Sequence, residues 1–146
     1  MIDPLVRPAT SADAAQLGWL EREARASLID RRGGNRWLAT HPPKDESWDA
    51  VLETGDVYVA EIDEVAVGYL VLILAGRIAV VDDVYVTPPA RELGFGDALL
   101  EAAIERARAA GCELLEGESL PGDRDTKNLY ERAGIKARLI TVSTPL

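Results

Sequence analysis

A short segment of the chain, residues 84–100, combines residue types that suit the binding of an anion. It reads VYVTPPARELGFGDALL: a strand-like run stops at two prolines, Arg91 follows, and Gly94 and Gly96 precede an apolar pattern of helical period. The first turn of a helix carries unpaired backbone N–H groups and a partial positive charge, and glycines let an anion approach them without meeting a Cβ. The segment therefore predicts an anion-binding turn, with a plain strand-to-helix turn as the alternative.

Two adjacent carboxylates, Asp82 and Asp83, precede this turn in the run IAVVDDVYV. Carboxylates bind cationic groups and accept protons as general bases. Because neighbouring side chains on a strand point to opposite faces, we expect only one of the two to reach a shared cleft. Solvent-exposed charges at the end of a strand are the alternative interpretation.

The elements that must position these residues indicate a single domain over residues 1–146, of the mixed α/β (α+β type) class. Two strand-like runs meet at Asp63-Glu64 as a hairpin, and a third run continues the antiparallel meander. The long helix after the third run leads to another strand, which makes a β-α-β crossover. We therefore expect a mixed central β-sheet with helices on both faces.

Capping residues and hydrophobic periodicity set the bounds of the expected elements. Thr10 and Asp13 have the spacing of a capping box at the start of a helix, and Gly111 and Gly134 are placed to end two others. In chain order we expect a strand at 5–8, a helix with apolar positions from 17 to 28, a loop at 31–43 with at most a short irregular helix, a small helix at 45–52, strands at 56–62, 65–75 and 78–86, a long helix, a strand at 112–120, a helix at 125–133 and a closing strand at 136–142.

Length, charge and cysteine content exclude several classes of function. The chain has 146 residues, a net charge of −9 and scattered arginines, which disfavours a nucleic-acid partner. The acidity indicates either solubility or attraction of cationic substrates. Cys112 is the single cysteine, so no internal disulfide forms, and no signal peptide or apolar run of membrane-spanning length is recognisable. We expect a soluble, cytoplasmic protein.

Two motifs carry a resemblance to a known family. The pattern V-x-P-x-x-R-x-x-G-x-G, which starts at Val86, is similar to the acetyl-CoA-binding signature of the GNAT superfamily of N-acetyltransferases. The segment LYERAGI, which contains Tyr130, resembles the second hallmark of that family, a Tyr-Glu-x-x-Gly-Phe segment. A helix and a strand of the expected lengths separate the two motifs, and the order of elements is similar over nearly the whole chain.

The resemblance implies transfer of an acetyl group from acetyl-CoA to a primary amine of a small molecule or protein, directly in a ternary complex and without a metal. The implied partners are acetyl-CoA and the amine acceptor, not a nucleic acid or a membrane. A catalytically silent acyl-CoA-binding or sensor domain is the alternative, since a fold does not guarantee chemistry. The residues that we expect at acetyl-CoA are Tyr85, Val86, Arg91, Glu92, Leu93, Gly94, Phe95, Gly96, Asp97 and Asp123.

The same resemblance assigns catalytic roles to three side chains. Tyr130 would protonate the leaving thiolate, because an unperturbed phenol has a pKa near 10; core packing is its alternative role. Asp82 and Asp83 stand where polyamine-type members of the family carry an acidic pair, so either would bind the amine or take its proton. Such acid and base groups serve acyl transfer by removing the amine proton and protonating the leaving group.

Backbone donors and the acceptor side complete the expected site. N–H groups at Tyr85 and Val86, where the family's strand bulges, would stabilise the oxyanion. Trp37 would form a wall of the acceptor pocket, or only anchor its loop. A histidine can act as a base near neutral pH, but for His41 a place on a surface loop is the favoured interpretation.

Three departures from the family pattern bear on these expectations. Asp123 stands where the family commonly has Asn, and Ile135 stands where it has Phe, which affects a pantetheine contact and a packing contact. Only one strand is expected after the last helix, where the family usually has two. An open sheet edge of this kind makes a homodimer a candidate assembly.

Overall fold

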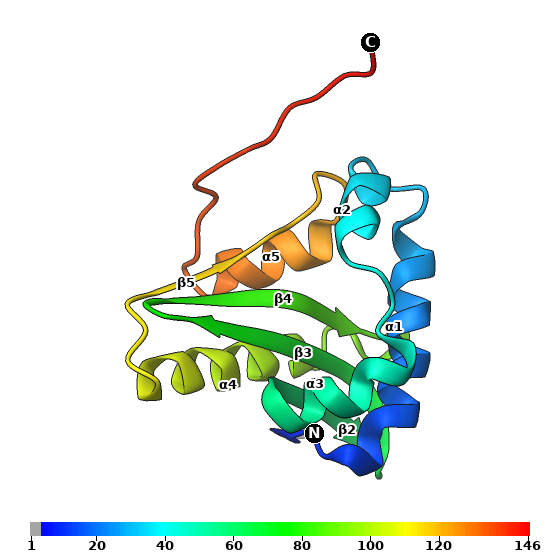
Figure 1. The fold of residues 1–146 in the computed structure, drawn as a ribbon, viewed down its shortest axis with the longest axis vertical. Helices are drawn as coiled ribbons and strands as arrows, with labels where there is room; N and C mark the ends of the chain where they lie inside the picture. Colours follow the sequence, from blue (N-terminus) through cyan, green and yellow to red (C-terminus); the bar gives the residue numbers. More distant parts are fainter. Residues whose placement is uncertain (1–3) are drawn as a thin grey trace.

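Three strand-like runs and two flanking segments pair into one sheet, as the computed structural model shows for residues 4–146 (Figure 1). The five strands lie in the order of the sequence, and all neighbours are antiparallel except the last pair, β4 and β5. The expected meander and β-α-β crossover are thus confirmed. The strands are β1 (Leu5–Pro8), β2 (Asp56–Ile62), β3 (Val65–Ala75), β4 (Ile78–Val86) and β5 (Leu114–Gly117).

Local signals in the sequence set the turns and helix ends. Asp63 and Glu64 adopt positive φ angles of 48° and 68° and form the predicted hairpin between β2 and β3. Thr10 N–H donates to the Asp13 carboxylate at 2.7 Å, as expected of a capping box. The helices are α1 (Ala14–Leu28), α2 (Gly34–Thr40), α3 (Trp48–Thr54), α4 (Phe95–Ala109) and α5 (Arg124–Arg132), with short 3-10 turns at Ser11–Asp13, Asp45–Ser47 and Pro88–Ala90.

Helices cover both faces of the sheet and form two separate apolar layers. Helices α1 and α3 pack on one face, where Leu17, Leu20 and Trp48 are buried against β2 and β3. Helices α4 and α5 cover the other face, where Phe95 and Leu99 are buried. The apolar stripe that predicts α4 is therefore the face that contacts the sheet.

A β-bulge at Asp82 reverses which residues of β4 face which layer. Consecutive residues of β3 pair with Asp83 and Val81, so Asp82 has no partner across the ladder. Before the bulge, Val81 packs in the α4 layer, and after it Val84 packs there, while Asp83 and Tyr85 turn toward α1. The strict alternation expected for the acidic pair is thus wrong, because the extra residue interrupts it.

The closing strand expected at residues 136–142 is absent from the structure. This segment has no regular secondary structure and leaves the body of the molecule, as the red end of the chain in Figure 1 shows. Leu139 and Val142 are 89% and 88% exposed. A strand-like pattern requires a neighbouring edge to pair with, and the described part of the chain places none beside this segment. The preceding strand is also shorter than expected, because pairing with β4 ends at Gly117.

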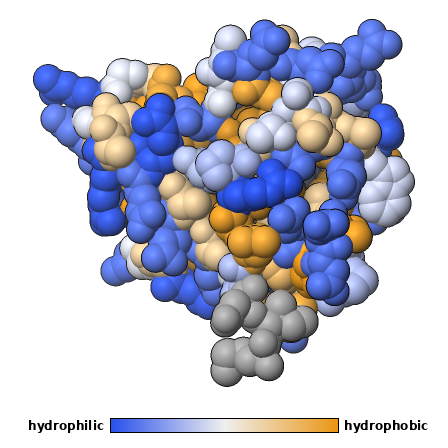
Figure 2. Space-filling view, turned by 90° about the horizontal axis from the view of Figure 1, so that it is seen from below, coloured by the Kyte–Doolittle hydropathy of each residue, from blue (hydrophilic) through white to orange (hydrophobic). Residues whose placement is uncertain are grey.

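No helix among residues 4–146 is long and apolar enough to cross a bilayer. On the face shown in Figure 2, hydrophilic residues surround smaller apolar patches. Scattered exposed apolar residues, such as Trp19 and Ile29, are normal for a folded domain.

Candidate active site

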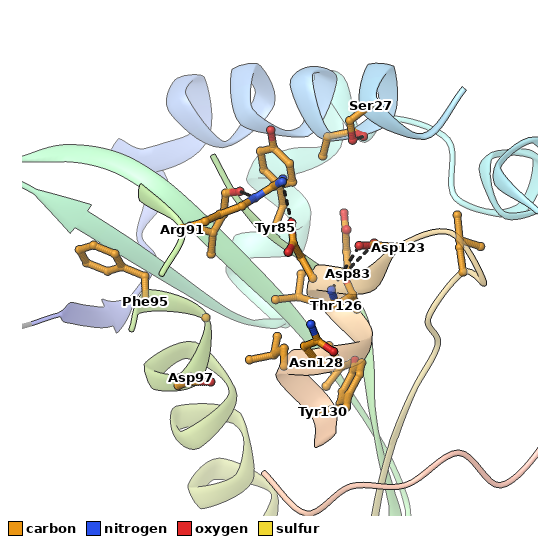
Figure 3. Close-up of a pocket in the computed structure, with 18 of the residues that line it drawn as sticks. Ser27, Asp83, Tyr85, Arg91, Phe95, Asp97, Asp123, Thr126, Asn128 and Tyr130 are labelled. Atoms are coloured by element: carbon orange, nitrogen blue, oxygen red, sulfur yellow. Dashed lines mark hydrogen bonds and ion pairs between the residues drawn. The ribbon is translucent and has the colours of Figure 1, made fainter. Parts of the chain in front are cut away.

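A pocket of about 510 Å³ opens where β4 ends, between α1, the turn before α4, and α5 (Figure 3). It collects nearly all of the residues that the sequence predicts for the site. Leu93 is the exception, since it does not line the pocket and is partly exposed. The predicted residues that do line it are Trp37, Asp82, Asp83, Tyr85, Val86, Arg91, Glu92, Gly94, Phe95, Gly96, Asp97, Asp123 and Tyr130.

The pocket exists because β4 and β5 pair over only four residues. The last paired residues are Val81 and Gly117, and beyond them one edge of β4 is free. Thr87 N–H donates to Val67 of β3 at 2.8 Å. Because an antiparallel ladder alternates, the N–H group of Val86 points away from β3, toward the pocket side, whereas that of Tyr85 points toward β3. Of the two predicted oxyanion donors, only Val86 is therefore available.

The turn before α4 contains the two glycines of the predicted anion-binding segment. Gly94 is the N-cap residue of α4 with φ +89°, a conformation that L side chains rarely adopt, so the turn requires glycine there. A Cβ on Gly96 would lie 3.4 Å from Leu129 of α5, which makes the passage between the turn and α5 narrow. Phe95 is buried in the α4 layer, so only its backbone faces the pocket.

One ion pair connects α5 to this turn, and a second connects α5 to the start of α4. The Nε of Arg91 donates to the Val86 carbonyl at 2.9 Å, and its Nη1 lies 3.0 Å from Asp125. Arg132 pairs with Asp97 at 3.0 Å. Both pairs are largely exposed, so they contribute little stability.

Tyr130 is buried with its hydroxyl unpaired. The side chain is 7% exposed, and the oxygen has no hydrogen-bond partner within the described part of the chain. Burial, together with the negative charges of Asp83, Glu118 and Asp123, raises the pKa of the phenol, so it stays protonated at neutral pH. A buried hydroxyl without a partner is costly unless a bound ligand supplies one.

The two carboxylates of the acidic pair have different environments. Asp83 is buried, and its Oδ2 lies 2.6 Å from the Arg25 guanidinium and accepts from the Tyr69 hydroxyl at 2.8 Å. Burial is the largest single influence and opposes the charged form of Arg25, but the charge and hydrogen bond of Asp83, together with Tyr69 and Glu21, outweigh it and raise the pKa of the guanidinium. Asp83 is thus neutralised by a permanent cation.

Asp82 instead faces α2. Its Oδ1 lies 3.3 Å from Nε2 of His41, which is half-buried rather than exposed on a surface loop as the sequence favoured. The His41 ring stacks on Trp37 with centroids 4.0 Å apart, and Arg25 lies over the same ring at 4.8 Å. Trp37 itself lines the pocket.

Two of the predicted residues have more local roles than expected, and two residues that contact the pocket lining were not predicted. Asp123 is the N-cap of α5 and accepts from Thr126 N–H at 3.2 Å, so part of its carboxylate is engaged. Tyr85 directs its ring toward α1 (Figure 3), where the hydroxyl donates to Glu23 at 2.7 Å. The two residues that were not predicted are Gly117, which lies against Tyr130, and Arg25, which pairs with Asp83. The sequence carries no recognisable signal for either, except that Arg25 follows Glu21 at the i,i+4 spacing of an ion pair.

A comparison with protein-family models decides the family of the chain. The model described as "Acetyltransferase (GNAT) family" matches residues 17–135, which include every residue of the pocket. The chain belongs to the GNAT family of acetyltransferases. In this GNAT acetyltransferase, the matched region begins in α1 and ends just after α5. No curated protein matches the chain.

Solved structures share the fold of this GNAT acetyltransferase. A ribosomal-protein-alanine N-acetyltransferase from Brucella melitensis matches with a TM-score of 0.74 and 17% identity, over 99% of each chain. The aminoglycoside N-acetyltransferase AAC(6')-Iy, in complex with a CoA bisubstrate analog, matches with a TM-score of 0.70 and 14% identity, over 99% of this chain and 100% of that one. A transcriptional regulator from Bacillus halodurans matches with a TM-score of 0.70 and 24% identity, over 99% and 100% of the chains.

Proposed function

We propose that the protein transfers the acetyl group of acetyl-CoA directly to a primary amine of a small molecule or protein in a ternary complex. The observation that carries this proposal is the unpaired, buried hydroxyl of Tyr130, which shares one pocket with the glycine turn of α4. An anion site and a protonated acid within one pocket are what a phosphate-bearing thioester requires.

The residues present fit acetyl-CoA, which supplies the activated acetyl group as a thioester. The N–H groups at the start of α4 and the Arg91 side chain would hold its pyrophosphate, since Gly94 and Gly96 leave that approach open. The free edge of β4 would hold the chain that leads to the thioester. There the Val86 N–H would donate to the acetyl oxygen as negative charge develops on it.

Two side chains would move the protons. Asp82 lines the pocket and would take the proton of the amine, directly or through a water molecule. Tyr130 would give its hydroxyl proton to the departing sulfur. The raised pKa keeps this phenol protonated over the physiological pH range, so the proton is in place before each turnover.

The charge of the pocket supports an amine acceptor. The acidic lining residues outnumber the arginines, which favours a group that arrives as an ammonium ion. Two of the structural neighbours act on amines, one on an alanine of a ribosomal protein and one on an aminoglycoside, so both protein and small-molecule acceptors fit the fold. We also place the protein in the cytoplasm, since Cys112 has no disulfide partner.

Thioester consumption across a panel of amines tests the proposal. The panel contains diamines, polyamines, aminoglycosides, amino acids and peptides with a free N-terminus, and release of free CoA is followed with a thiol reagent. We expect amine-dependent release of CoA for at least one class. Binding of acetyl-CoA in calorimetry without turnover of any amine would instead identify a silent acyl-CoA-binding domain.

A further inference from the structure

Asp83 is the first of four charged side chains that pair with one another in the interior of the protein. Arg25, on α1, is 6% exposed; its guanidinium lies 2.6 Å from Asp83 and 3.4 Å from Glu21. Glu21 is fully buried and in turn pairs with Lys44 at 3.1 Å. Two carboxylates and two cations therefore alternate where an unpaired charge would be costly.

Arg25 also holds α2, which lies on the acceptor side of the pocket. Its Nε donates to the backbone oxygen of His41 at 3.1 Å, and its guanidinium carbon lies 4.8 Å from the centroid of the Trp37 ring. His41 stacks on Trp37 and reaches Asp82. One buried side chain thus connects the bulge of β4 to α2.

We propose that Arg25 is a positioning residue for the acceptor amine, a role that rests on the proposed acetyl transfer. It neutralises Asp83 and holds α2 over the bulge, so that His41 fixes the carboxylate of Asp82. Asp82 is then the one member of the pair that receives the amine proton: the N–H bond breaks and an O–H bond forms on its carboxylate. Asp83 takes no part in the chemistry, although both carboxylates line the pocket.

Lysine cannot replace Arg25 in this role. A guanidinium is planar and offers several donors at once, so it meets a carboxylate, a carbonyl oxygen and an aromatic ring together, whereas an ammonium is a compact charge. Arg25→Lys therefore keeps a cation opposite Asp83 but loses the contacts to His41 and Trp37. The variant separates the positioning of α2 from the neutralisation of the buried carboxylate.

Steady-state kinetics of Arg25→Lys test the role, with each substrate varied at a saturating level of the other. We expect the KM for the acceptor to rise about tenfold or more, while the KM for acetyl-CoA stays at the wild-type value. Lys44→Met is the matched control, because it removes a cation of the same network that does not contact α2 or Asp82. We expect this control to lower the melting temperature and to leave both KM values unchanged.

A double variant shows whether Arg25 acts through Asp82. In the Asp82→Asn background, Arg25→Lys should change kcat/KM for the acceptor by less than about twofold, because coupled residues are not additive. Additive losses, or a wild-type acceptor KM in a folded Arg25→Lys variant, overturn the proposal. If Arg25→Lys does not fold, His41→Gln is tested in its place. This variant removes the contact between His41 and Asp82 and must raise the acceptor KM.

The proposed function and the positioning role fail in different ways. If the wild-type protein acetylates no amine in the panel, the proposed function fails and the role of Arg25 fails with it. If the wild-type protein is active and both Arg25→Lys and His41→Gln keep its acceptor KM, only the positioning role is wrong.

Discussion

The hydroxyl of Tyr130 occupies the space in which a side chain of Gly117 would begin. A Cβ built on Gly117 would lie 2.1 Å from this oxygen and 2.7 Å from the ring carbon that bears it. Gly117 is the last residue of β5 that pairs with β4, so the phenol sits where the two strands separate. The absence of a side chain at one position of β5 therefore permits the placement of the proposed acid.

Gly117→Ala should displace the phenol and slow the reaction. The added methyl group cannot coexist with the observed Tyr130 ring, and a displacement of this size at a reacting group costs about 10²-fold in kcat. Gly122→Ala on the same connection is the control, because its nearest neighbour would be 3.9 Å away. Equal kcat values for the two variants would show that the position of the phenol does not matter.

Tyr130→Phe should lower kcat by about 10²-fold or more without loss of stability. Among residues 4–146 the hydroxyl has no hydrogen-bond partner, so removing it leaves no described group unsatisfied, and the melting temperature should stay the same or rise. Tyr85→Phe is the contrasting variant, because it breaks the hydrogen bond to Glu23 and should lower the melting temperature. Since burial raises the Tyr130 pKa, the wild-type kcat should show no loss from its ionisation below about pH 10. Wild-type turnover of Tyr130→Phe at saturating acceptor removes the phenol from the mechanism.

The two carboxylates should respond differently to neutralisation. Asp82→Asn should lower kcat/KM for the acceptor by roughly 10²–10⁴-fold and keep acetyl-CoA affinity, because a general base is lost. Asp83→Asn removes the negative charge that faces the buried guanidinium of Arg25. The main effect should therefore be a loss of stability, on the order of 3–5 kcal/mol. Chemical denaturation and kinetics on both variants distinguish them, and a reversed pattern would make Asp83 the base.

Gly96→Val should weaken the binding of acetyl-CoA by about tenfold or more, which is about 1.4 kcal/mol. The branched side chain would fill the narrow space beside Leu129, where phosphate oxygens must approach the first turn of α4. Calorimetric titration measures the affinity, and a melting curve checks the fold. Wild-type affinity in the folded variant would exclude the turn as the phosphate site.

The ion pair of Asp13 with Arg7 should make stability depend on pH at the acid end. Hydrogen bonds from Arg7 at 2.9 Å hold the pKa of Asp13 below its usual value of 3.8. This contribution is therefore complete above the unfolded-state pKa and is lost as the pH falls through the folded-state pKa. Asp13→Asn should melt lower than wild type near neutral pH, and the difference should shrink below about pH 4. A constant difference across that range would contradict this account.

Features with a local cause were predictable from the sequence. The hairpin at Asp63-Glu64 follows from two strand-like runs, and the turn at Gly94 follows from a position that only glycine fills easily. Tyr130 was located because the segment LYERAGI resembles a family motif, on a helix that Gly134 was predicted to end. In each case the decisive interaction lies within a few residues of the signal.

Features that depend on distant partners were not predictable. The bulge at Asp82 results from the register with β3, so the sequence of β4 alone gave the wrong orientation for the acidic pair. Arg25 and Asp83 are 58 positions apart, and nothing in either segment indicates the other. The segment at 136–142 has strand propensity, but propensity forms no ladder without a neighbouring edge.

Single-turnover transfer of an isotope-labelled acetyl group tests the central claim most directly. The protein is mixed with labelled acetyl-CoA, first alone and then with the best acceptor of the panel, and the protein and the amine are both measured by mass spectrometry. Direct transfer in a ternary complex predicts no label on the protein in the first reaction, and one labelled acetyl group on the amine for each CoA released in the second. Label bound covalently to the protein, or CoA release without acetylated amine, would contradict the account.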